Sequence, residues 1–379
     1  MIRRMASFLL CILFLMGSFA ACQPVPGEAA APAVTAAPTD APTPAPTAAP
    51  TPSPTLPSSP APTETLEPTP EPTPEPTPTP LPATDPVITL TGGEQLTVNA
   101  AFTFTDPGAV ARDYLGTDLT DRIAVEGTVI PYLVGEYALT YTVTDDDGRR
   151  AEAWRTVTVV PVELPQVIDP PLKTIYLTFD DGPATYTDAL LDTLKQYDVK
   201  ATFFVVGRSP YRDVIRRAYE EGHSIGVHSY THEFENIYAS EEAFFADFLA
   251  TEEVIHRQTG QYTTIFRFPG GSANTISLYN PGIISRLAKI MEDMGYRYFD
   301  WNASAKDAQS PGTDNILEYY STLVSTVKQD GSPTIVLQHD PNVYSIRALK
   351  YFIPWALKNG YTFLPLDMTS PVIHSRIYN

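Results

Sequence analysis

The chain has 379 residues, enough for two or three domains, and its 44 acidic and 25 basic residues give a formal net charge of −19. No region beyond the first 21 residues has a net positive charge, which argues against nucleic acid as a partner and against electrostatic capture of anionic lipids. Only Cys11 and Cys22 are cysteines. The chain beyond Cys22 therefore has no internal disulfide and no thiolate for catalysis or metal binding.

The N-terminus has the features of an export signal. Two arginines precede an apolar run over residues 6–21, which is too short to span a bilayer comfortably. The run ends in the letters SFAAC, which resemble a bacterial lipobox, although Phe19 stands where leucine is usual. The resemblance implies that residues 1–21 are a signal peptide. It also implies that a lipid on Cys22 anchors an exported surface lipoprotein to the membrane, with ordinary secretion after Ala20 as the alternative.

The next segment, residues 22–84, consists mainly of alanine, proline, threonine, serine and glutamate, without an aromatic residue. Such a composition buries too little apolar surface to offset the entropy lost on ordering. The repeated letters EPTPEPTPTP favour polyproline II, a stiff extended form of about 3.1 Å per residue. We predict a disordered tether that holds the folded part away from a membrane. Binding to a proline-recognition module is the alternative.

Residues 85–161 change to short stretches of alternating apolar and polar residues separated by turn residues. This spacing is typical of a small all-β sandwich. The expected strands are 87–90, 96–98, 123–126, 137–143 and 154–160.

The letters DPGAVARD, GTDLTDRI and GEYALTYTVTDDDGR in this segment resemble a bacterial immunoglobulin-like domain of surface proteins. The resemblance implies a spacer, or a weak adhesion or glycan-binding role. Asp145, Asp146 and Asp147 could hold calcium, but the sequence favours a solvated hairpin tip.

From residue 170 to residue 379 the pattern alternates between strands and helices. Leu190, Leu191 and Leu194 recur at helical spacing and are assigned to the core. Seven strands with crossover helices predict an α/β fold, a distorted parallel (β/α)7–8 barrel separate from the sandwich. The expected strands are 174–179, 201–206, 224–227, 263–268, 297–300, 334–337 and 361–364. The expected helices are 186–196, 211–221, 241–258, 283–294, 316–328 and 345–358.

Polar side chains follow these strands at their carboxyl ends, which converge on one face of a βα barrel. The converging residues are Asp180, Asp181, His228, Arg267, Asp300 and His339. The sequence therefore predicts a single site on this face.

Two adjacent carboxylates, Asp180 and Asp181, end the first of these strands and repel each other. A divalent metal bound by one would relieve the repulsion and leave the other free as a base. The letters HSYTH place His228 and His232 four residues apart, on one face if they lie on a helical turn. Two imidazoles and the Asp181 carboxylate suit Zn²⁺ or another first-row metal. A solvated Asp-Asp-Gly turn is the alternative.

Four motifs, TFDDG, HSYTH, RFPGG and LQH, occur in this order over residues 174–366. They resemble the motifs of the NodB-like polysaccharide deacetylases, the family-4 carbohydrate esterases. The resemblance implies metal-dependent removal of acetyl groups from N-acetylated sugars. It implies that Asp180 is the catalytic base, that Arg267 orients it, and that the metal is bound by Asp181, His228 and His232. By the same resemblance, His339 is the general acid and Leu337 lines the acetate pocket.

A further motif of the family, which lies between RFPGG and LQH, is altered in this chain. Asp307 matches its last aspartate and is expected to support the acid, whereas Ser304 and Ala308 stand where the family has aspartate and tryptophan. Trp301 either supplies the missing aromatic wall or belongs to the core. Gly270 stands where an aromatic residue is common, which is expected to open the site, and its N–H is expected to face the oxyanion.

These residues predict acid–base catalysis in which a base takes a proton from water and an acid protonates the departing amine, with a bell-shaped rate profile. We expect a metal-dependent deacetylase acting on N-acetylglucosamine-containing polysaccharide, with peptidoglycan as the first candidate substrate. O-deacetylation of a polymer such as xylan and a catalytically silent glycan-binding protein are the alternatives. The expected cofactor is one divalent ion, Zn²⁺ first, then Co²⁺, Mn²⁺ or Ni²⁺. Nothing in the sequence implies an oligomer.

Overall fold

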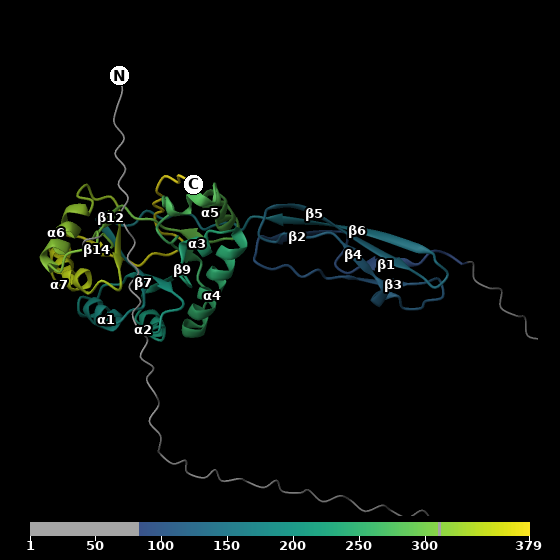
Figure 1. Cartoon of the computed structure of the whole chain (residues 1–379), viewed down its shortest axis with the longest axis horizontal. Helices are drawn as coiled ribbons and strands as arrows, with labels where there is room; N and C mark the ends of the chain where they lie inside the picture. The colour runs from purple at the N-terminus through teal and green to yellow at the C-terminus, as the bar shows by residue number, and fades with distance from the viewer. Residues whose placement is uncertain (1–82, 310–311) are drawn as a thin grey trace, which may run out of the picture. The chain divides into compact units, whose positions relative to one another are not determined.

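The structure is a computed structural model that describes residues 83–309 and 312–379 (Figure 1). The predicted signal peptide, Cys22 and nearly all of the predicted tether lie outside these residues. The described residues form an all-β domain followed by an α/β domain. No helix among them is long and apolar enough to cross a membrane.

The all-β domain contains two sheets. The first pairs β1 (Val87–Leu90) with β3 (Ala109–Arg112), antiparallel. The second has the order β2-β6-β5-β4, in which β5 and β6 form a long hairpin. Its strands are β2 (Gln95–Asn99), β4 (Ala124–Glu126), β5 (Gly135–Thr144) and β6 (Arg150–Val160). Four strands overlap those expected from the sequence and β1 matches in full, whereas β3 was missed.

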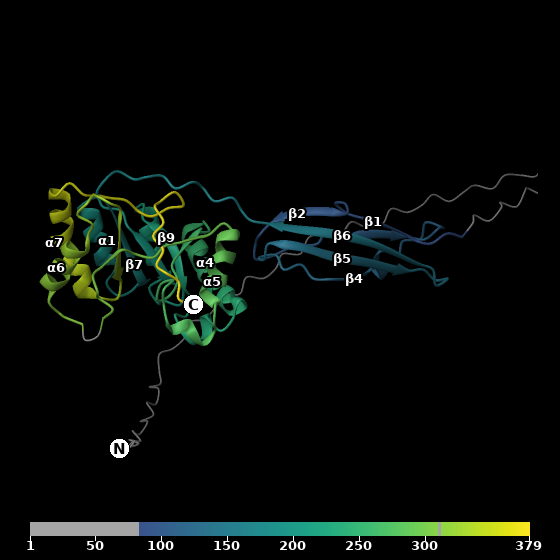
Figure 2. The ribbon, with the colours of Figure 1, turned by 90° about the horizontal axis from the view of Figure 1, so that it is seen from above.

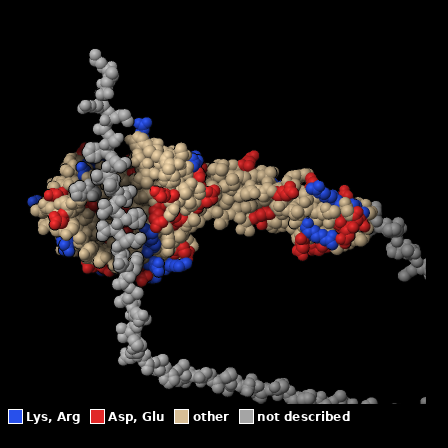
Figure 3. All heavy atoms as spheres, in the orientation of Figure 1, with Lys and Arg blue, Asp and Glu red and all other residues tan. Residues whose placement is uncertain are grey.

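The hairpin tip between β5 and β6 carries the three consecutive aspartates. Asp145 accepts the backbone N–H of Asp147 and of Arg149, which closes the turn. Arg149 forms ion pairs with Asp145 and Asp147, and Arg122 with Asp146. Figure 3 shows mixed acidic and basic side chains at this end of the domain. The arginines neutralise these carboxylates, in agreement with a hairpin tip.

The α/β domain contains one parallel sheet of eight strands, in the order β11-β10-β9-β8-β7-β13-β12, with β14 also paired to β7. The central strand β7 (Thr174–Gly182) is buried along nearly its whole length, as a strand covered on both faces should be. The other strands are β8 (Thr202–Val206), β9 (Ser224–Ser229), β10 (Ile265–Phe266), β11 (Arg297–Tyr298), β12 (Ala303–Ser304), β13 (Thr334–His339) and β14 (Thr362–Phe363).

Helices surround this sheet, as Figures 1 and 2 show from two directions. Each buries an apolar stripe, and Leu190, Leu191 and Leu194 lie in the core as expected. The helices are α1 (Thr187–Gln196), α2 (Val214–Glu220), α3 (Phe234–Ile237), α4 (Glu241–Thr259), α5 (Ile283–Asp293), α6 (Ile316–Thr326) and α7 (Val343–Lys358). The six helices expected from the sequence are present, and α3 is additional.

The edge strands β11 and β12 are not paired with each other among the described residues, so the sheet is an open half-barrel. Both are two residues long, as is β10, which leaves few backbone groups for further pairing. The expected parallel βα architecture is therefore confirmed, as an open half-barrel and not as a closed barrel. The open edge leaves the carboxyl ends of the strands on one side of the domain, where the predicted site residues lie.

Candidate active site

A distortion at the end of β7 brings two neighbouring carboxylates to the same side. Successive residues of a regular strand point to opposite faces. Here the pairing with β8 shifts between Asp180 and Gly182, and Asp181 has a left-handed φ of 68°. A bulge of this kind re-aims a side chain. Asp180 and Asp181 therefore both reach toward His228, at 3.9 Å and 3.4 Å from its Nε2.

Three of the predicted site residues form a compact group. Asp181 Oδ1 lies 3.4 Å from Nε2 of His228 and 3.2 Å from Nε2 of His232. Nδ1 of His228 lies 2.9 Å from the carbonyl oxygen of Arg267. A carbonyl only accepts, so Nδ1 carries the hydrogen and the neutral ring directs the lone pair of Nε2 toward Asp181. These three residues are the one group among the described residues with a metal-ligand arrangement.

The donor set fits a cation. Asp181 Oδ1 is buried and has no hydrogen-bond partner among the described residues. An unpartnered carboxylate oxygen facing two imidazole nitrogens is costly unless a positive charge lies between them. Two nitrogens and one oxygen match the ligands of catalytic zinc and related first-row metals.

The pKa values of the three groups reflect the same crowding of charge. Burial opposes protonation of His228, but the charges of Asp180 and Asp181 outweigh burial and raise its pKa. Burial, followed by the charge of His228, lowers the pKa of His232. Burial acts to raise the pKa of Asp181, yet the close approach of His228, with a smaller contribution from His232, holds it well below its usual range. The two carboxylates that favour a protonated imidazole would equally favour a bound cation.

The expectation that His228 and His232 lie on one helical turn is wrong. His228 belongs to β9, and His232 lies in the turn after it with a left-handed φ of 56°. Asp247 on α4 causes this turn. Its carboxylate accepts the Ser229 hydroxyl, the Tyr230 N–H, and both the N–H and hydroxyl of Thr231, all within 2.9 Å.

Sequence reasoning missed Asp247. A signal was present, because this carboxylate lies between Phe245 and Phe248, which pack in the core. An acid placed among core residues needs hydrogen-bond donors, and the turn of the HSYTH motif supplies them.

Arg267 holds Asp180 in place. Its guanidinium is fully buried and donates from Nη1 to Asp180 Oδ1 at 2.8 Å and to the Thr178 hydroxyl at 2.7 Å. Its Nε and Nη2 donate to two backbone carbonyls. The group lies 4.3 Å from the ring centre of Phe204 and 5.6 Å from that of Trp301. Trp301 thus packs beside the arginine and lies partly buried against a hydrophobic cluster.

His339 is the last residue of β13 and lies directly opposite Asp180 of the neighbouring strand β7. Its Nδ1 lies 2.8 Å from Asp307 Oδ1, and its backbone N–H donates to Asp307 Oδ2 at 2.8 Å. Burial acts to lower the pKa of His339, but the hydrogen bond and charge of Asp307, with smaller help from Asp180 and Asp181, raise it to about 9. At neutral pH the imidazole is therefore protonated, with Nε2–H available as a donor.

An open pocket of about 420 Å³ adjoins these groups, lined in part by Asp181, Asp307, Ala308 and His339. Neither Leu337 nor Trp301 lines it. Leu337 is buried in β13, and the role predicted for it stays a prediction. Gly270 lies in the turn after β10 with a φ of 76°, and a side chain there would meet Phe234 at 3.2 Å. Phe234 packs edge-on against His232, 5.0 Å between ring centres.

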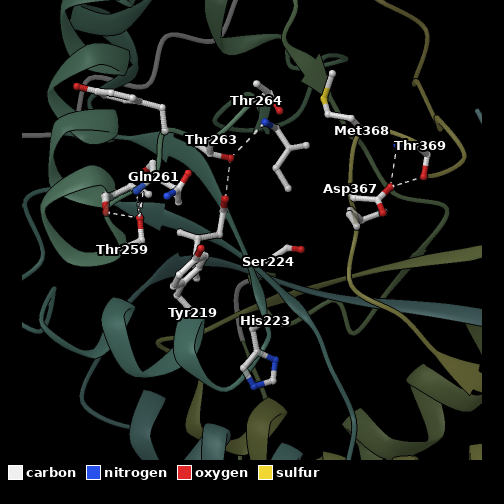
Figure 4. A pocket seen from close by; sticks show the side chains of 15 residues that line it. Tyr219, His223, Ser224, Thr259, Gln261, Thr263, Thr264, Asp367, Met368 and Thr369 are labelled. Atoms are coloured by element: carbon white, nitrogen blue, oxygen red, sulfur yellow. Dashed lines mark hydrogen bonds between the residues drawn. The ribbon is translucent and has the colours of Figure 1, made fainter. Parts of the chain in front are cut away.

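A second pocket, of about 440 Å³, lies at the opposite ends of β9 and β10 (Figure 4). The Thr263 hydroxyl there donates to the Ile225 carbonyl at 2.8 Å, and Asp367 accepts the N–H and hydroxyl of Thr369. The first bond fixes the connection that leads into β10, and the other two close a turn in the C-terminal segment. None of the residues predicted for the site lines this pocket.

The other three histidines have structural contacts. Nδ1 of His223 accepts the Ala201 N–H at 3.0 Å, and burial lowers its pKa to about 4. His256 stacks on Tyr262, and His374 stacks on Tyr298. These contacts agree with the absence of a predicted role.

An aspartate paired with a buried arginine, a histidine paired with an aspartate, and a group that could hold a cation converge at the carboxyl ends of one parallel sheet, an arrangement that suits hydrolysis. A family model described as polysaccharide deacetylase matches residues 168–299, and one described as bacterial surface protein, Ig-like domain, matches residues 88–159. The first match includes Asp180, Asp181, His228, His232 and Arg267, but ends before Asp307 and His339.

Individual relatives agree with the family match. A peptidoglycan-N-acetylglucosamine deacetylase of Bacillus cereus is 32% identical over 205 residues, covering 52% of this chain and 87% of that protein. The deacetylase PgdA of Listeria monocytogenes is 31% identical over 215 residues, but these cover only 41% of its length and 54% of this chain. The catalytic domain of a Eubacterium rectale peptidoglycan N-acetylglucosamine deacetylase is 43% identical, with a TM-score of 0.55, covering 57% of this chain and 98% of that structure.

The chain belongs to the polysaccharide deacetylase family, whose carbohydrate esterases are hydrolases, and an immunoglobulin-like domain precedes the deacetylase domain. The family resemblance stated from the sequence motifs is confirmed.

Proposed function

We propose that the protein removes N-acetyl groups by hydrolysis from an N-acetylglucosamine-containing polysaccharide, with peptidoglycan as the substrate. The observation that carries this proposal is the placement of an aspartate–arginine pair and a histidine–aspartate pair on either side of the Asp181–His228–His232 group. Asp180 is paired with buried Arg267, and His339 is paired with Asp307. Hydrolysis of an amide needs both a base for the water and an acid for the amine.

The chain's own residues account for the proton transfers. Arg267 orients Asp180 by donating to its Oδ1, so that Asp180 accepts the proton of the attacking water. Asp307 orients the His339 ring through Nδ1, so that Nε2–H points away from Asp307 and donates to the nitrogen of the departing sugar amine. A bound divalent cation would supply Lewis-acid polarisation of the acetyl carbonyl and lower the pKa of a water molecule. The N–H of Gly270 is the proposed backbone donor to the developing oxyanion.

The proposed cation ligands are Asp181 Oδ1 and the Nε2 atoms of His228 and His232. Zn²⁺ is the first candidate because three protein ligands from this set leave positions for water and substrate. Co²⁺, Mn²⁺ and Ni²⁺ accept similar ligands. The family to which the chain belongs is metal-dependent in general, which supports a metal here without naming it.

Peptidoglycan is proposed because relatives with 31–32% identity bear the name peptidoglycan-N-acetylglucosamine deacetylase. A lipid on Cys22, the proline-rich tether and the immunoglobulin-like domain as a spacer would place the enzyme at the envelope of its own cell. Secretion after Ala20 is the alternative location. O-deacetylation is the second candidate reaction, because the same base and acid serve an ester.

Acetate release by the full chain tests the proposal, with N-acetylglucosamine oligomers, peptidoglycan and acetylated xylan as substrates, before and after chelation. We expect release from the glucosamine polymers that stops on chelation and falls by about 10²–10⁴-fold in Asp180→Asn, the usual contribution of a general base. Asp198→Asn is the matched control, since its side chain is 94% exposed. Release from xylan alone would replace the proposal with the esterase reaction. Release from none of the three would favour a glycan-binding role.

A further inference from the structure

The pocket beside His339 has two chemically different sides. Asp181, Asp307 and His339 form its polar side, next to the reacting groups. Its other side is formed by Pro341, Asn342 and the first turn of α7, where Tyr344 is the only phenylalanine, tyrosine or tryptophan in the lining. A pyranose ring has the same division, with polar hydroxyls around its rim and C–H groups on its faces. Ligand pockets typically combine apolar walls with a few placed polar groups.

Tyr344 is available to a ligand. The residue is 37% exposed. Among the described residues, its ring forms no stack with another aromatic ring and its hydroxyl forms no hydrogen bond. An aromatic ring with one accessible face and one end in water is suited to contact a ligand that is both apolar and polar.

The position of Tyr344 is fixed relative to the acid. Asn342 caps α7 by accepting the N–H groups of Tyr344 and Ser345. The amide nitrogen of Asn342 donates to the Asp307 carbonyl at 3.0 Å, and Asp307 holds His339. A short chain of contacts thus connects the backbone that carries the ring to the acid, which limits the backbone entropy lost when a ligand stacks on the ring.

The neighbouring side of the pocket is open at Ala308, which has only a methyl group. Trp301 does not line this pocket, and packs instead beside Arg267, partly buried against a hydrophobic cluster. Tyr344 is therefore the aromatic surface that this pocket offers.

We propose that Tyr344 is the platform on which a sugar ring of the polymer stacks, and that it determines affinity for the polymer without taking part in proton transfer. The proposal rests on the proposed function for the identity of the sugar as N-acetylglucosamine. Stacking on a fixed ring stabilises the bound ground state and the transition state alike. Loss of such a contact raises KM and leaves kcat unchanged.

Steady-state acetate release from the N-acetylglucosamine pentamer by the full chain is the first measurement. We expect Tyr344→Ala to raise KM about ten-fold with kcat changed by less than about two-fold, as for loss of uniform binding. Tyr344→Phe should match the wild type, since the ring and not the hydroxyl makes the contact. Tyr351→Ala is the matched control, because Tyr351 lies further along α7, is 52% exposed and does not line the pocket. An unchanged KM in Tyr344→Ala, or a lower kcat at unchanged KM, would overturn the platform role.

Binding of the same pentamer to the Asp180→Asn chain, followed by calorimetry, separates this inference from the proposed function. We expect Kd to rise about ten-fold when Tyr344→Ala is added, in parallel with KM. If the wild type releases no acetate but the pentamer binds through Tyr344, the proposed function fails and the platform stands. Equal binding with and without the ring would refute the platform even if acetate is released. No binding to either chain would also refute it.

Discussion

Asp307 holds His339 through both of its carboxylate oxygens, one 2.8 Å from the ring Nδ1 and the other accepting the backbone N–H at 2.8 Å. The carboxylate thereby fixes the ring orientation and favours the protonated ring at the same time. The pKa of His339 lies at about 9, above the ordinary value of 6.5. The protonated acid is therefore present at neutral pH and is lost as the pH rises through about 9.

Asp307→Asn should move the alkaline limb of the rate profile to lower pH. The amide keeps a hydrogen-bond acceptor but removes the negative charge, so the pKa of His339 falls back toward 6.5 and the protonated fraction at pH 8 falls with it. We expect kcat/KM at pH 8 to drop by about ten-fold or more, since one pKa unit is a factor of ten. The measurement is kcat/KM for acetate release between pH 5 and 10, with Asp198→Asn as control. An alkaline limb that stays in place would contradict the role of Asp307.

Asp247 supports the turn that carries the proposed metal ligand His232, without being a ligand itself. Its carboxylate receives four donors from the turn that carries His232. Asp247→Ala leaves these donors unpaired, so the turn loosens and His232 loses its left-handed position. We expect Zn²⁺ affinity to fall by about 10–100-fold, as for other residues that support metal ligands. Competition with a chelating dye measures this.

Glu253→Gln is the matched control for Asp247, because it changes a half-exposed carboxylate on the same helix that is paired only with Arg257. Its Zn²⁺ affinity should equal that of the wild type. Equal affinities in Asp247→Ala and in the wild type would show that the turn keeps its shape without the carboxylate.

The sequence was sufficient where structure follows from local periodicity. Buried strands and amphipathic helices repeat at two and 3.6 residues, so β7 and the long helices were found close to their observed bounds. Parallel strands place their carboxyl ends together, so Asp180, His228, Arg267 and His339 could be expected at one face before any geometry was known.

The sequence was insufficient where structure depends on distant partners. The turn at His232 is set by Asp247, fifteen residues later, and two histidines four apart give no hint of it. Whether Trp301 is a wall or core could not be decided from its neighbours, because the answer depends on Arg267. The two-residue edge strand β12 also escapes periodicity, whereas the edge strand β11 lies within the strand expected at 297–300.

Gly182 should be irreplaceable because Asp340 occupies the space where a side chain would start. A Cβ at this position would lie 1.9 Å from Asp340 Oδ2. Asp340 is fully buried, and its Oδ2 accepts the Thr187 hydroxyl at 2.7 Å, so it cannot move aside freely. We expect Gly182→Ala to lower stability by about 1–3 kcal/mol, as overpacking does. Activity should also fall, because Asp181 is the adjacent residue.

Thermal unfolding and acetate release check this expectation. Gly135→Ala is the control, since its methyl group would meet only Tyr137 at 3.8 Å. Combining Gly182→Ala with Asp340→Ala should recover part of the loss in stability, because the clash is removed. Additive losses in the double variant would show that Asp340 is not the obstacle.

Glu252 should make the stability of the deacetylase domain depend on pH. It is 4% exposed and accepts the Tyr296 hydroxyl at 2.9 Å. Burial raises its pKa to about 7, although the hydrogen bond from Tyr296 lowers it. The folded protein then holds a proton that the unfolded chain loses near pH 4.5. Stability therefore decreases as the pH rises from about 4.5 to 7, and the full penalty applies above 7.

Glu252→Gln removes this penalty because an amide does not ionise, and its oxygen can still accept the Tyr296 hydroxyl. We expect the variant to be more stable than the wild type by roughly 1–3 kcal/mol at pH 8 and equal to it at pH 4. Calorimetric unfolding at the two pH values measures the difference, with Glu253→Gln as the exposed neighbour that should show none. A stabilisation of the same size at both pH values would mean that packing, and not the buried charge, causes the difference in stability between the variant and the wild type.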